Sequence, residues 1–315
     1  MLLKFWYVIL YLKWCEVYFM IITTNEPLHL YQVEQGGILV TGLLTEFDVS
    51  ALPEQAILPH ESVSVSHAMA LKKRVQLEKL LLPPCLLIGR LNLDEVRWQA
   101  ECVETAQWYS DCGECTHRLY AVENPRVLQE FRQQISMHQQ WLIADGHHRM
   151  FAASQRHAPQ SRMMAWLVPQ QEAVVTSFAV QASYTQAVDV TKFKQHLSDF
   201  DICECSEAEA DYTIWVAEVA LCFALQHVKS DSYLIQTQLR RALQALPAFE
   251  ELWSNNKVEL SDDPHVVTAI CRDPHIEDIF TAAKAGKYFP EKSTLFTHKA
   301  DSQVLYHLNQ QAICA

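Results

Sequence analysis

The sequence predicts an α+β fold with two domains, and three observations support that prediction. Half of the 315 residues are hydrophobic, which is enough for a sizeable buried core. Between residues 85 and 182, short apolar strands are interspersed with amphipathic helical segments. After residue 188 the pattern changes to helical segments separated by single strands, so we expect a smaller α/β C-terminal domain to begin near residue 190.

A β-hairpin is the first predicted element. Apolar and polar residues alternate in LHLYQV at 28–33, the glycines at 36–37 provide the turn, and ILVTGLL continues as the second strand. Residues 94–109 fit neither a helical nor a strand pattern. The other elements expected before residue 190 are helices over 67–82, 125–137 and 150–156, and strands over 85–88, 141–144, 163–169 and 175–182.

In the C-terminal part, three segments have the apolar spacing of helices and two have that of strands. We expect helices over 189–200, 234–253 and 273–286, and strands over 212–217 and 265–271. Gly286 is typical of the residue that follows a helix C-terminus. No Gly/Ser-rich linker marks the boundary near residue 190.

The first 19 residues are very apolar, but they do not predict a membrane anchor. Lys4, Lys13 and Glu16 interrupt them, and the longest uncharged run, 5–12, is far shorter than the roughly 20 residues that span a bilayer. No cleavage site of the signal-peptide type follows. We therefore expect residues 1–19 to be an N-terminal extension, followed by domains over 20–190 and 191–315.

Charge and cysteine usage indicate the compartment and the class of partner. A formal net charge of −12 argues against nucleic acid as a partner, because phosphate contacts need a basic surface. Small molecules are the expected partners, and oligomeric state is left open. Ten cysteines at irregular spacings, in a chain too large to need disulfides, favour the reducing cytoplasm.

The segment Cys112-Gly113-Glu114-Cys115 with His117 has the spacing of half a zinc site or of a redox pair. No second CxxC exists, so a surface turn with ordinary thiols is the favoured interpretation. Phosphate-loop, GxGxxG, GxSxG and HExxH motifs are absent as well. Any catalytic site must therefore be assembled from loops of another kind.

A first candidate loop is Asp145-Gly146-His147-His148-Arg149, between a strand and a helix. The first N–H groups of a helix lack intrahelical partners and carry partial positive charge, so this position attracts phosphate. An arginine there adds a fork of donors for phosphate oxygens. Asp145 could cap the helix or hold magnesium on a nucleotide. The alternative, a simple cap with surface histidines, explains less of this polar cluster.

Two further loops could join the first. In the loop Pro59-His60-Glu61, the glutamate could act as a general base on a substrate hydroxyl, or be a carboxylate at a helix start without chemistry. Near the C-terminus, Lys292-Ser293-Thr294 offers an ammonium and two hydroxyls, or forms a solvated loop. The residues alone leave both alternatives open.

Taken in order, these three elements resemble the prokaryotic family catalogued as domain-of-unknown-function 1015. Its members carry PHE, ADGHHR and PPKST elements, matched here by 59–61, 144–149 and 290–294. The elements are also similar to those of the free-serine kinases, which share a fold with the ParB nucleotide-binding domain and with sulfiredoxin. The resemblance implies a ParB/sulfiredoxin-like fold for residues 20–190, with Glu61 as base and the DGHHR turn as the site for phosphates and substrate.

The resemblance has clear departures. The kinases follow the last element with Arg-His, which helps to bind substrate, whereas this chain has Leu295-Phe296. The Pro-x-His-Arg element of the larger family is absent at 180–184. Sulfiredoxin chemistry needs a cysteine where this turn has His147, so the nucleophile is missing.

These observations together predict a phosphotransferase that moves a phosphoryl group from ADP or ATP, with magnesium, to the hydroxyl of a small metabolite, with free serine as one candidate. We expect Glu61, Asp145 and His148 to be catalytic, and Gly146, His147, Arg149, Lys292, Ser293 and Thr294 to bind the nucleotide. The alternative is a non-catalytic nucleotide-binding or sensing protein. A zinc-dependent or structural protein built on Cys112, Cys115 and His117 is a third class.

Overall fold

The computed structural model describes residues 28–49, 56–78, 82–93, 102–110, 114–137, 140–154, 162–217, 219–226, 231–256 and 260–314. Residues 1–19 and Cys112, on which two of the predictions depend, lie outside this part. The chain divides into two compact units. Unit 1 takes the described residues of Met1–Pro59, Val63–Ala173 and His298–Ala315, and unit 2 takes those of His60–Ser62 and Val174–Thr297.

This division differs from the single boundary expected near residue 190. Strand β10 (Ala179–Tyr184) belongs to unit 2 because it pairs with β14 (Phe249–Asn255) on one side and β15 (Val266–Cys271) on the other. Helix α9 (Gln303–Cys314) belongs to unit 1, where the backbone N–H of Asp301 donates to the Tyr31 hydroxyl at 3.1 Å. Contacts with residues distant in the sequence therefore decide to which unit β10 and α9 belong.

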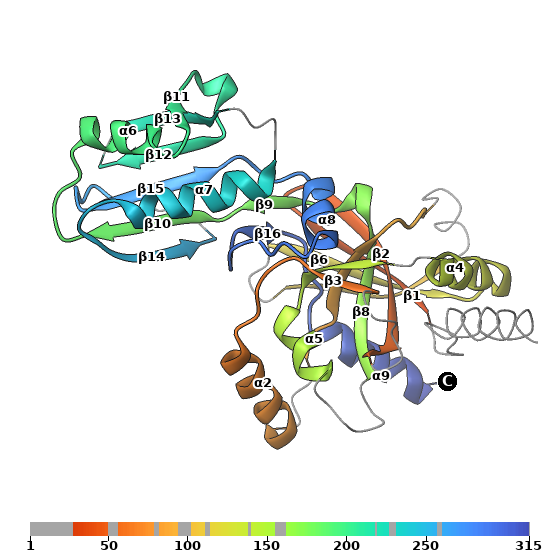
Figure 1. Ribbon diagram of the computed structural model, residues 1–315. Coiled ribbons are helices and arrows are strands. Elements are labelled where there is room, and N and C mark those ends of the chain that lie inside the picture. Colours follow the sequence, from red (N-terminus) through yellow and green to blue (C-terminus); the bar gives the residue numbers. More distant parts are fainter. Residues whose placement is uncertain are drawn as a thin grey trace, which may run out of the picture. The chain divides into compact units, whose positions relative to one another are not determined.

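Unit 1 is built on a mixed eight-stranded sheet in the order β3-β7-β4-β8-β2-β1-β6-β5. Figure 1 labels β1, β2, β3, β6 and β8 of this sheet. Most neighbours are antiparallel, and the pairs β3–β7 and β4–β8 are parallel. The strands are β1 (His29–Gln35), β2 (Ile38–Asp48), β3 (Ile57–Pro59), β4 (Cys85–Gly89), β5 (Cys102–Tyr109), β6 (Cys115–Val122), β7 (Trp141–Asp145) and β8 (Arg162–Pro169).

The predicted hairpin is confirmed as β1–β2. Gln35 pairs with Ile38, which leaves a two-residue turn of Gly36 and Gly37, and both glycines have positive φ, +59° and +78°. Two positive φ values in a two-residue loop are the signature of a type I′ turn, which suits the twist of the strands. The ambiguous segment 94–109 contains β5, whose described residues pair with β6.

Among the described residues of unit 1, the helices are α2 (Val65–Glu78), α4 (Pro125–Met137), α5 (His147–Ser154) and α9, with a short 3₁₀ turn at Gln170–Glu172. On α4, Val127, Phe131 and Ile135 repeat at helical spacing and are buried in one hydrophobic cluster with residues of β4 and β7. The same cluster takes Met150 of α5. This packing fixes the end of β7 and the start of α5, where the ADGHHR element lies.

Unit 2 contains an antiparallel six-stranded sheet in the order β11-β13-β12-β15-β10-β14. Its additional strands are β11 (Ile202–Glu204), β12 (Tyr212–Val216) and β13 (Val219–Leu225), and its helices are α6 (Val190–Ser198), α7 (Ser232–Ala245) and α8 (Ile276–Lys284), with a 3₁₀ turn at Glu207–Glu209. A separate two-stranded sheet pairs β9 (Val175–Ser177) with β16 (Thr294–Phe296). All these described pairs are antiparallel, so unit 2 is α+β.

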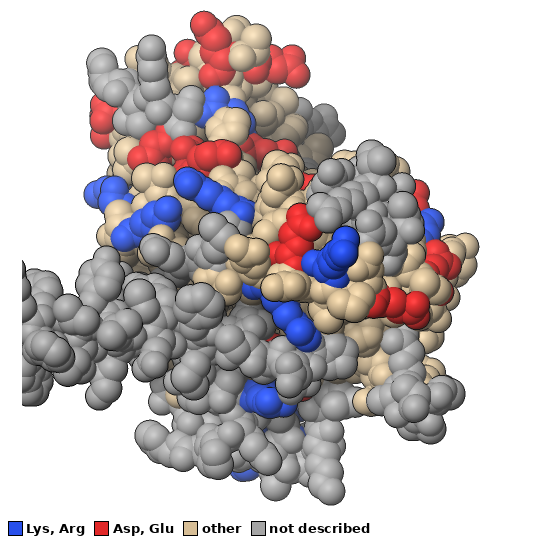
Figure 2. Space-filling view, turned by 90° about the vertical axis from the view of Figure 1, so that its right-hand side faces the viewer, with Lys and Arg blue, Asp and Glu red and all other residues tan. Residues whose placement is uncertain are grey.

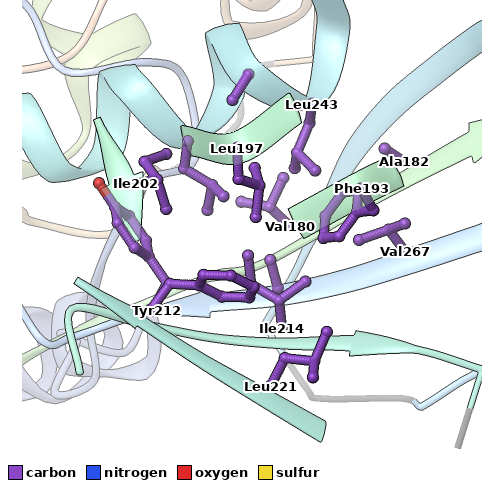
Figure 3. Packing of buried hydrophobic residues seen from close by; sticks show 14 of the residues in the cluster. Val180, Ala182, Phe193, Leu197, Ile202, Tyr212, Ile214, Leu221, Leu243 and Val267 are labelled. Atoms are coloured by element: carbon purple, nitrogen blue, oxygen red, sulfur yellow. The ribbon is translucent and has the colours of Figure 1, made fainter. Parts of the chain in front are cut away.

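One face of the six-stranded sheet carries α6 and α7. Figure 3 shows Phe193 and Leu197 of α6 and Leu243 of α7 directed toward Val180 and Ile214 of the sheet, and all of these are fully or almost fully buried. Aspartates cap both helices, since the carboxylates of Asp189 and Asp231 each accept two N–H groups of the first turn.

The prediction of one helix over 234–253 is wrong in its second half. Helix α7 ends at Ala245, and Pro247 prevents continuation because it has no N–H to donate and disfavours helix at the residue before it. Ala248 has a φ of +66°, and the chain then enters β14. Among the described helices of both units, none is long and apolar enough to cross a membrane.

Candidate functional site

The ADGHHR element lies at the carboxyl end of β7 in unit 1. β7 is held between β3 and β4, and its last residue, Asp145, is half-buried. Gly146 has a φ of +102°, and a Cβ built there would lie 2.6 Å from the Cys85 sulfur. Helix α5 then starts at His147, and Met150 N–H donates to the Gly146 carbonyl at 2.8 Å. Only glycine fits this turn.

Within this element, Arg149 binds protein groups rather than projecting into solvent. Its guanidinium donates to the Asp145 carboxylate and to the carbonyls of Pro83 and Pro84, at 3.0 Å for Pro84. The side chain is 12% exposed. The sequence predicts that Arg149 binds phosphate, whereas in unit 1 its donors connect β7 to the loop before β4. Phosphate binding by Arg149 stays a prediction that requires some of these contacts to be exchanged.

The Asp145 carboxylate forms a second ion pair, with Lys299. The ammonium of Lys299 lies 3.1 Å from Asp145 Oδ1, while Arg149 binds the other oxygen. Lys299 is half-exposed, so a ligand cation could replace its ammonium more readily than the enclosed guanidinium. Nothing near Asp145 in the sequence indicates this partner, which follows 154 residues later.

The two histidines of the turn differ in their surroundings. His147 is buried in unit 1, and His148 is half-buried with its ring centroid 5.9 Å from that of His67 on α2. His148 Nε2 is buried and has no hydrogen-bond partner among the described residues. Unpartnered buried nitrogens are uncommon, so this atom is the one in the turn most in need of a ligand group.

The other two candidate elements come together in unit 2. Glu61 forms an isolated parallel bridge with Phe289, and Phe289 N–H donates to the His60 carbonyl at 2.7 Å. The Thr294 hydroxyl then donates to Glu61 Oε1 at 2.8 Å, and the Thr294 N–H lies 3.3 Å from the same oxygen. Residues separated by more than 230 positions thus form one hydrogen-bonded group.

His60 completes a short relay in this group. It is fully buried, and its Nε2 lies 2.7 Å from Thr294 Oγ1. When Glu61 is ionised, the Thr294 hydroxyl donates its single proton to Glu61, and His60 then donates to Thr294 through Nε2–H. Phe289 and Phe296 pack edge-on against the His60 ring, with centroids 6.3 and 5.6 Å away. The imidazole is therefore fixed in one orientation.

Burial raises the pKa of the Glu61 carboxyl above its ordinary value, against hydrogen bonds that favour the charged form. Those bonds come from the Thr294 hydroxyl and from the backbone N–H groups of Thr294, Lys292 and Ser293. Lys292 has a φ of +53°, which turns the backbone so that consecutive N–H groups face the carboxylate. A raised pKa and an oriented carboxylate are properties of a general base.

The remaining predicted ligands in this loop have different surroundings. Ser293 is fully buried, and its hydroxyl donates to the Pro290 carbonyl at 2.7 Å. Lys292 is exposed, whereas the Thr294 hydroxyl is engaged with Glu61. Lys292 is therefore the one member of the triplet whose side chain meets solvent in the described structure.

Sequence reasoning missed Arg240, which lies on α7. Its Nη2 donates to the Lys292 carbonyl at 3.1 Å and to Ser254 Oγ at 2.8 Å. Helical periodicity gives no sign of this role, because an arginine on an amphipathic helix is ordinarily a surface residue. Only its partners, 14 and 52 residues later, reveal it.

The described part of the CxxC segment contributes a structural histidine. The Tyr31 hydroxyl lies 2.8 Å from His117 Nδ1, and His117 is almost completely buried. Within the described residues, neither Cys115 nor His117 belongs to a group of three side chains that could hold a metal ion.

Comparisons with known proteins give a family and a fold. The family model described as a protein of unknown function (DUF1015) matches residues 10–181, more than half of the chain. No curated protein has a matching sequence. The structure is similar to SbnI with a C-terminal truncation from Staphylococcus aureus, with a TM-score of 0.51 and 8% identity, covering 85% of this chain and 93% of that chain. That likeness shows a shared α+β fold.

Two other solved structures have lower TM-scores. A free serine kinase in complex with AMP has a TM-score of 0.40 at 14% identity, covering 83% of this chain and 93% of its own. A conserved hypothetical protein from Pyrococcus furiosus has a TM-score of 0.39 at 15% identity, covering 82% and 93%. The ParB/sulfiredoxin likeness of the N-terminal part stays a prediction.

Proposed function

We propose a function from the premise that the chain belongs to the DUF1015 family: it binds a nucleotide, ADP or ATP with magnesium, and transfers a phosphoryl group to the hydroxyl of a small metabolite. Free serine is one candidate acceptor. Two observations support this proposal. The chain belongs to the family, and its PHE (59–61), ADGHHR (144–149) and PEKST (290–294) elements resemble those of the free-serine kinases.

The observation that supports catalysis is the environment of Glu61. The carboxylate is 16% exposed, is oriented by Thr294, and has its pKa raised by burial. A solvated carboxylate would be a weak base, whereas a raised pKa brings proton affinity closer to that needed at neutral pH. In the proposed reaction Glu61 accepts the proton of the acceptor hydroxyl while that oxygen attacks the terminal phosphorus and the nucleotide leaves with its remaining phosphates.

The start of α5 supports the proposal that phosphates bind at the ADGHHR turn. Gly146 permits the tight turn at which α5 begins, the N–H groups of the first helical turn face outward along the axis, and His148 Nε2 has no partner among the described residues. Asp145 is the carboxylate suited to magnesium, which prefers oxygen ligands. It would exchange the Lys299 ammonium for the cation. Magnesium supplies charge neutralisation on the phosphates.

A second candidate function is nucleotide binding without turnover, and Phe296 favours it. The side chain at this position is 2% exposed and packs on the His60 ring, so it offers no charged group to an acceptor. In this reading the phosphate turn is retained, and Glu61 serves only to hold the Lys292–Thr294 turn.

The proposed partners and compartment follow from charge and cysteine state. Figure 2 shows Lys and Arg side chains dispersed among acidic and neutral ones on the face in view, and the net charge is −12. Small molecules suit such a surface better than nucleic acid does. Cys85, Cys203, Cys205, Cys222 and Cys271 are free thiols, which supports the proposal of a reducing cytoplasm.

The test uses the full chain, with ADP or ATP and magnesium. Calorimetry measures nucleotide binding, and phosphate transfer is followed across a panel of hydroxy amino acids and hydroxy acids. We expect Glu61→Gln to lower turnover by about 10²–10⁴-fold and leave nucleotide affinity unchanged, since a general base acts only on the chemical step. Glu250→Gln, at an exposed position of β14, is the matched control.

Each result selects one alternative. Turnover that disappears with Glu61→Gln but persists with Glu250→Gln supports the phosphotransferase. Binding of either nucleotide with no turnover on any acceptor supports the binding protein. Absence of binding to both ADP and ATP with magnesium would refute both functions.

A further inference from the structure

Arg240 is tied to the backbone on which Glu61 depends. From α7 its Nη2 reaches the Lys292 carbonyl at 3.1 Å and Ser254 Oγ at 2.8 Å. Ser254 sits on β14, which is fixed in the sheet by its pairing with Val180 of β10. The guanidinium therefore links the Lys292–Thr294 turn to two regular elements of unit 2.

The turn held in this way has an unusual backbone. Lys292 has a φ of +53°, a left-handed conformation that is strained for a residue with a side chain. The conformation has a consequence for Glu61, because the N–H groups of Lys292, Ser293 and Thr294 all donate to its carboxylate. The hydrogen bond from Arg240 to the Lys292 carbonyl therefore stabilises the strained peptide, and this peptide in turn directs N–H groups toward the Glu61 carboxylate.

The guanidinium of Arg240 is partly removed from water, which is unfavourable for its charged form. Burial lowers the pKa of its guanidinium, while Cys271, Glu61 and Glu291 act in the opposite direction. Its Nε is buried with no hydrogen-bond partner among the described residues. A buried donor left unpaired is destabilising, because it has lost its hydrogen bonds to water. Ordinary anchoring of a loop would not require a half-buried cation, since a neutral amide can donate to the same kinds of oxygen atom.

We propose that Arg240 is a positioning residue for Glu61: it holds the Lys292–Thr294 turn in the conformation that presents N–H groups to the carboxylate, and its positive charge favours the ionised form of Glu61. The proposal rests on the proposed function only in assigning Glu61 as the base. Its structural content, the link from Arg240 through the Lys292 peptide to Glu61, is measurable whether or not the protein turns over.

Other charged or titratable groups lie near Arg240 and Glu61. His60 faces Glu61 directly, with Nε2 3.8 Å from Oε1, and Thr294 lies between them in the relay. Cys271 of β15 and Glu291 of the loop act on Arg240. All of them stay in place in the variants below, so a change in the titration of Glu61 can be assigned to residue 240.

The experiment follows the Glu61 side-chain carboxyl by NMR titration in the full chain. We expect Arg240→Gln to move the pKa of Glu61 upward, because both the charge and the support of the turn are weakened. Arg240→Lys keeps the charge and should restore part of the difference. The control is Arg241→Gln, an exposed neighbour that donates to Gln238 and should leave the titration of Glu61 as in wild type.

Ser254→Ala separates position from charge and covers the case in which Arg240→Gln does not fold. It removes one anchor of the guanidinium and retains the cation. An upward shift in the pKa of Glu61 supports positioning through the turn, together with a matching shift in the acid limb of the pH–rate profile where turnover exists. A Glu61 titration that is identical in wild type, Arg240→Lys and Ser254→Ala would overturn the proposal.

Discussion

Replacing Gly146 by alanine tests whether the ADGHHR turn has the geometry described. With a φ of +102°, an alanine would lie outside the left-handed region that L-residues tolerate, at a cost of about 1–3 kcal/mol. Its Cβ would also sit 2.6 Å from the Cys85 sulfur and 3.1 Å from Arg149 Nε. Overpacking of this kind adds about 1–3 kcal/mol. The expected loss of stability for Gly146→Ala is therefore about 2–6 kcal/mol.

Gly36→Ala is the matched control in the same unit. Gly36 also has a positive φ, +59°, but a Cβ there meets nothing within 4 Å. Only the backbone term applies, so we expect a loss of about 1–2 kcal/mol. The difference between the two variants measures the contact with Cys85 and Arg149, and it should be at least about 1 kcal/mol on the same estimates.

The assay must report on unit 1 alone, since the chain has two units and unfolding need not be a single transition. Hydrogen exchange of amides in β4 and β7, measured against urea, gives that local free energy of opening. A Gly146→Ala loss no larger than that of Gly36→Ala would refute the reasoning. Cys85→Ala should cost less in the Gly146→Ala background than in wild type, because it removes the closest contact.

Two further predictions concern other groups of unit 1. Arg149→Lys should destabilise the β7–α5 junction by about 2 kcal/mol, because one ammonium cannot bind Asp145 and the Pro83 and Pro84 carbonyls at once. Hydrogen exchange of the amides in β7 and α5 measures this loss. The control is Arg162→Lys, at an exposed position, which should change little. Burial lowers the pKa of His117, so unit 1 should lose stability as pH falls through the ordinary value of 6.5 toward the folded value. Equal loss from pH 7 to 5 in wild type and His117→Gln would contradict this assignment.

Elements with strong local signals were predictable. Helix α4 spans 125–137 as expected, because proline at its first position and a regular apolar spacing specify both its start and its buried face. Gly286 likewise follows α8 with a φ of +68°, and Lys287 N–H returns to the Ala282 carbonyl, as helix-ending motifs require.

Strand pairing and unit membership were not predictable in the same way. The partners of β10 begin 65 residues or more further along the chain, and nothing in 179–184 indicates them. The segment FEELW at 249–253 continues the apolar period of α7, so periodicity alone extends the helix past Pro247. Tertiary pairing decides such cases, because short apolar segments suit either structure.

The candidate site shows the same contrast. Polar residues crowded around Gly146 predict a functional turn, and the sequence also predicts that Glu61 and Thr294 lie close together. In unit 2 the Thr294 hydroxyl donates to the Glu61 carboxylate, while their role in a site stays a prediction. Lys299 beside Asp145 and Arg240 behind Lys292 could not be inferred, because each is an isolated cation far from its partner in sequence. Nothing in the sequence indicates that the Arg149 guanidinium binds the Pro83 and Pro84 carbonyls, because backbone acceptors leave no residue pattern. Phosphate binding by Arg149 stays a prediction.

Glu61 is the position at which stability and the proposed function oppose each other, and the direction of that opposition can be measured. Its folded pKa is raised above the ordinary value of 4.5, so between these values the folded chain keeps a proton that the unfolded chain has released. Stability therefore falls as pH rises through this interval, and the loss persists at higher pH.

Glutamine mimics the protonated side chain. Glu61→Gln should then match wild type below the interval and be more stable above it, as followed by exchange of β16 amides from pH 4 to pH 8. A variant less stable than wild type at pH 8 would mean that the charged carboxylate supports the fold, and a structural role for Glu61 would then replace that of a base.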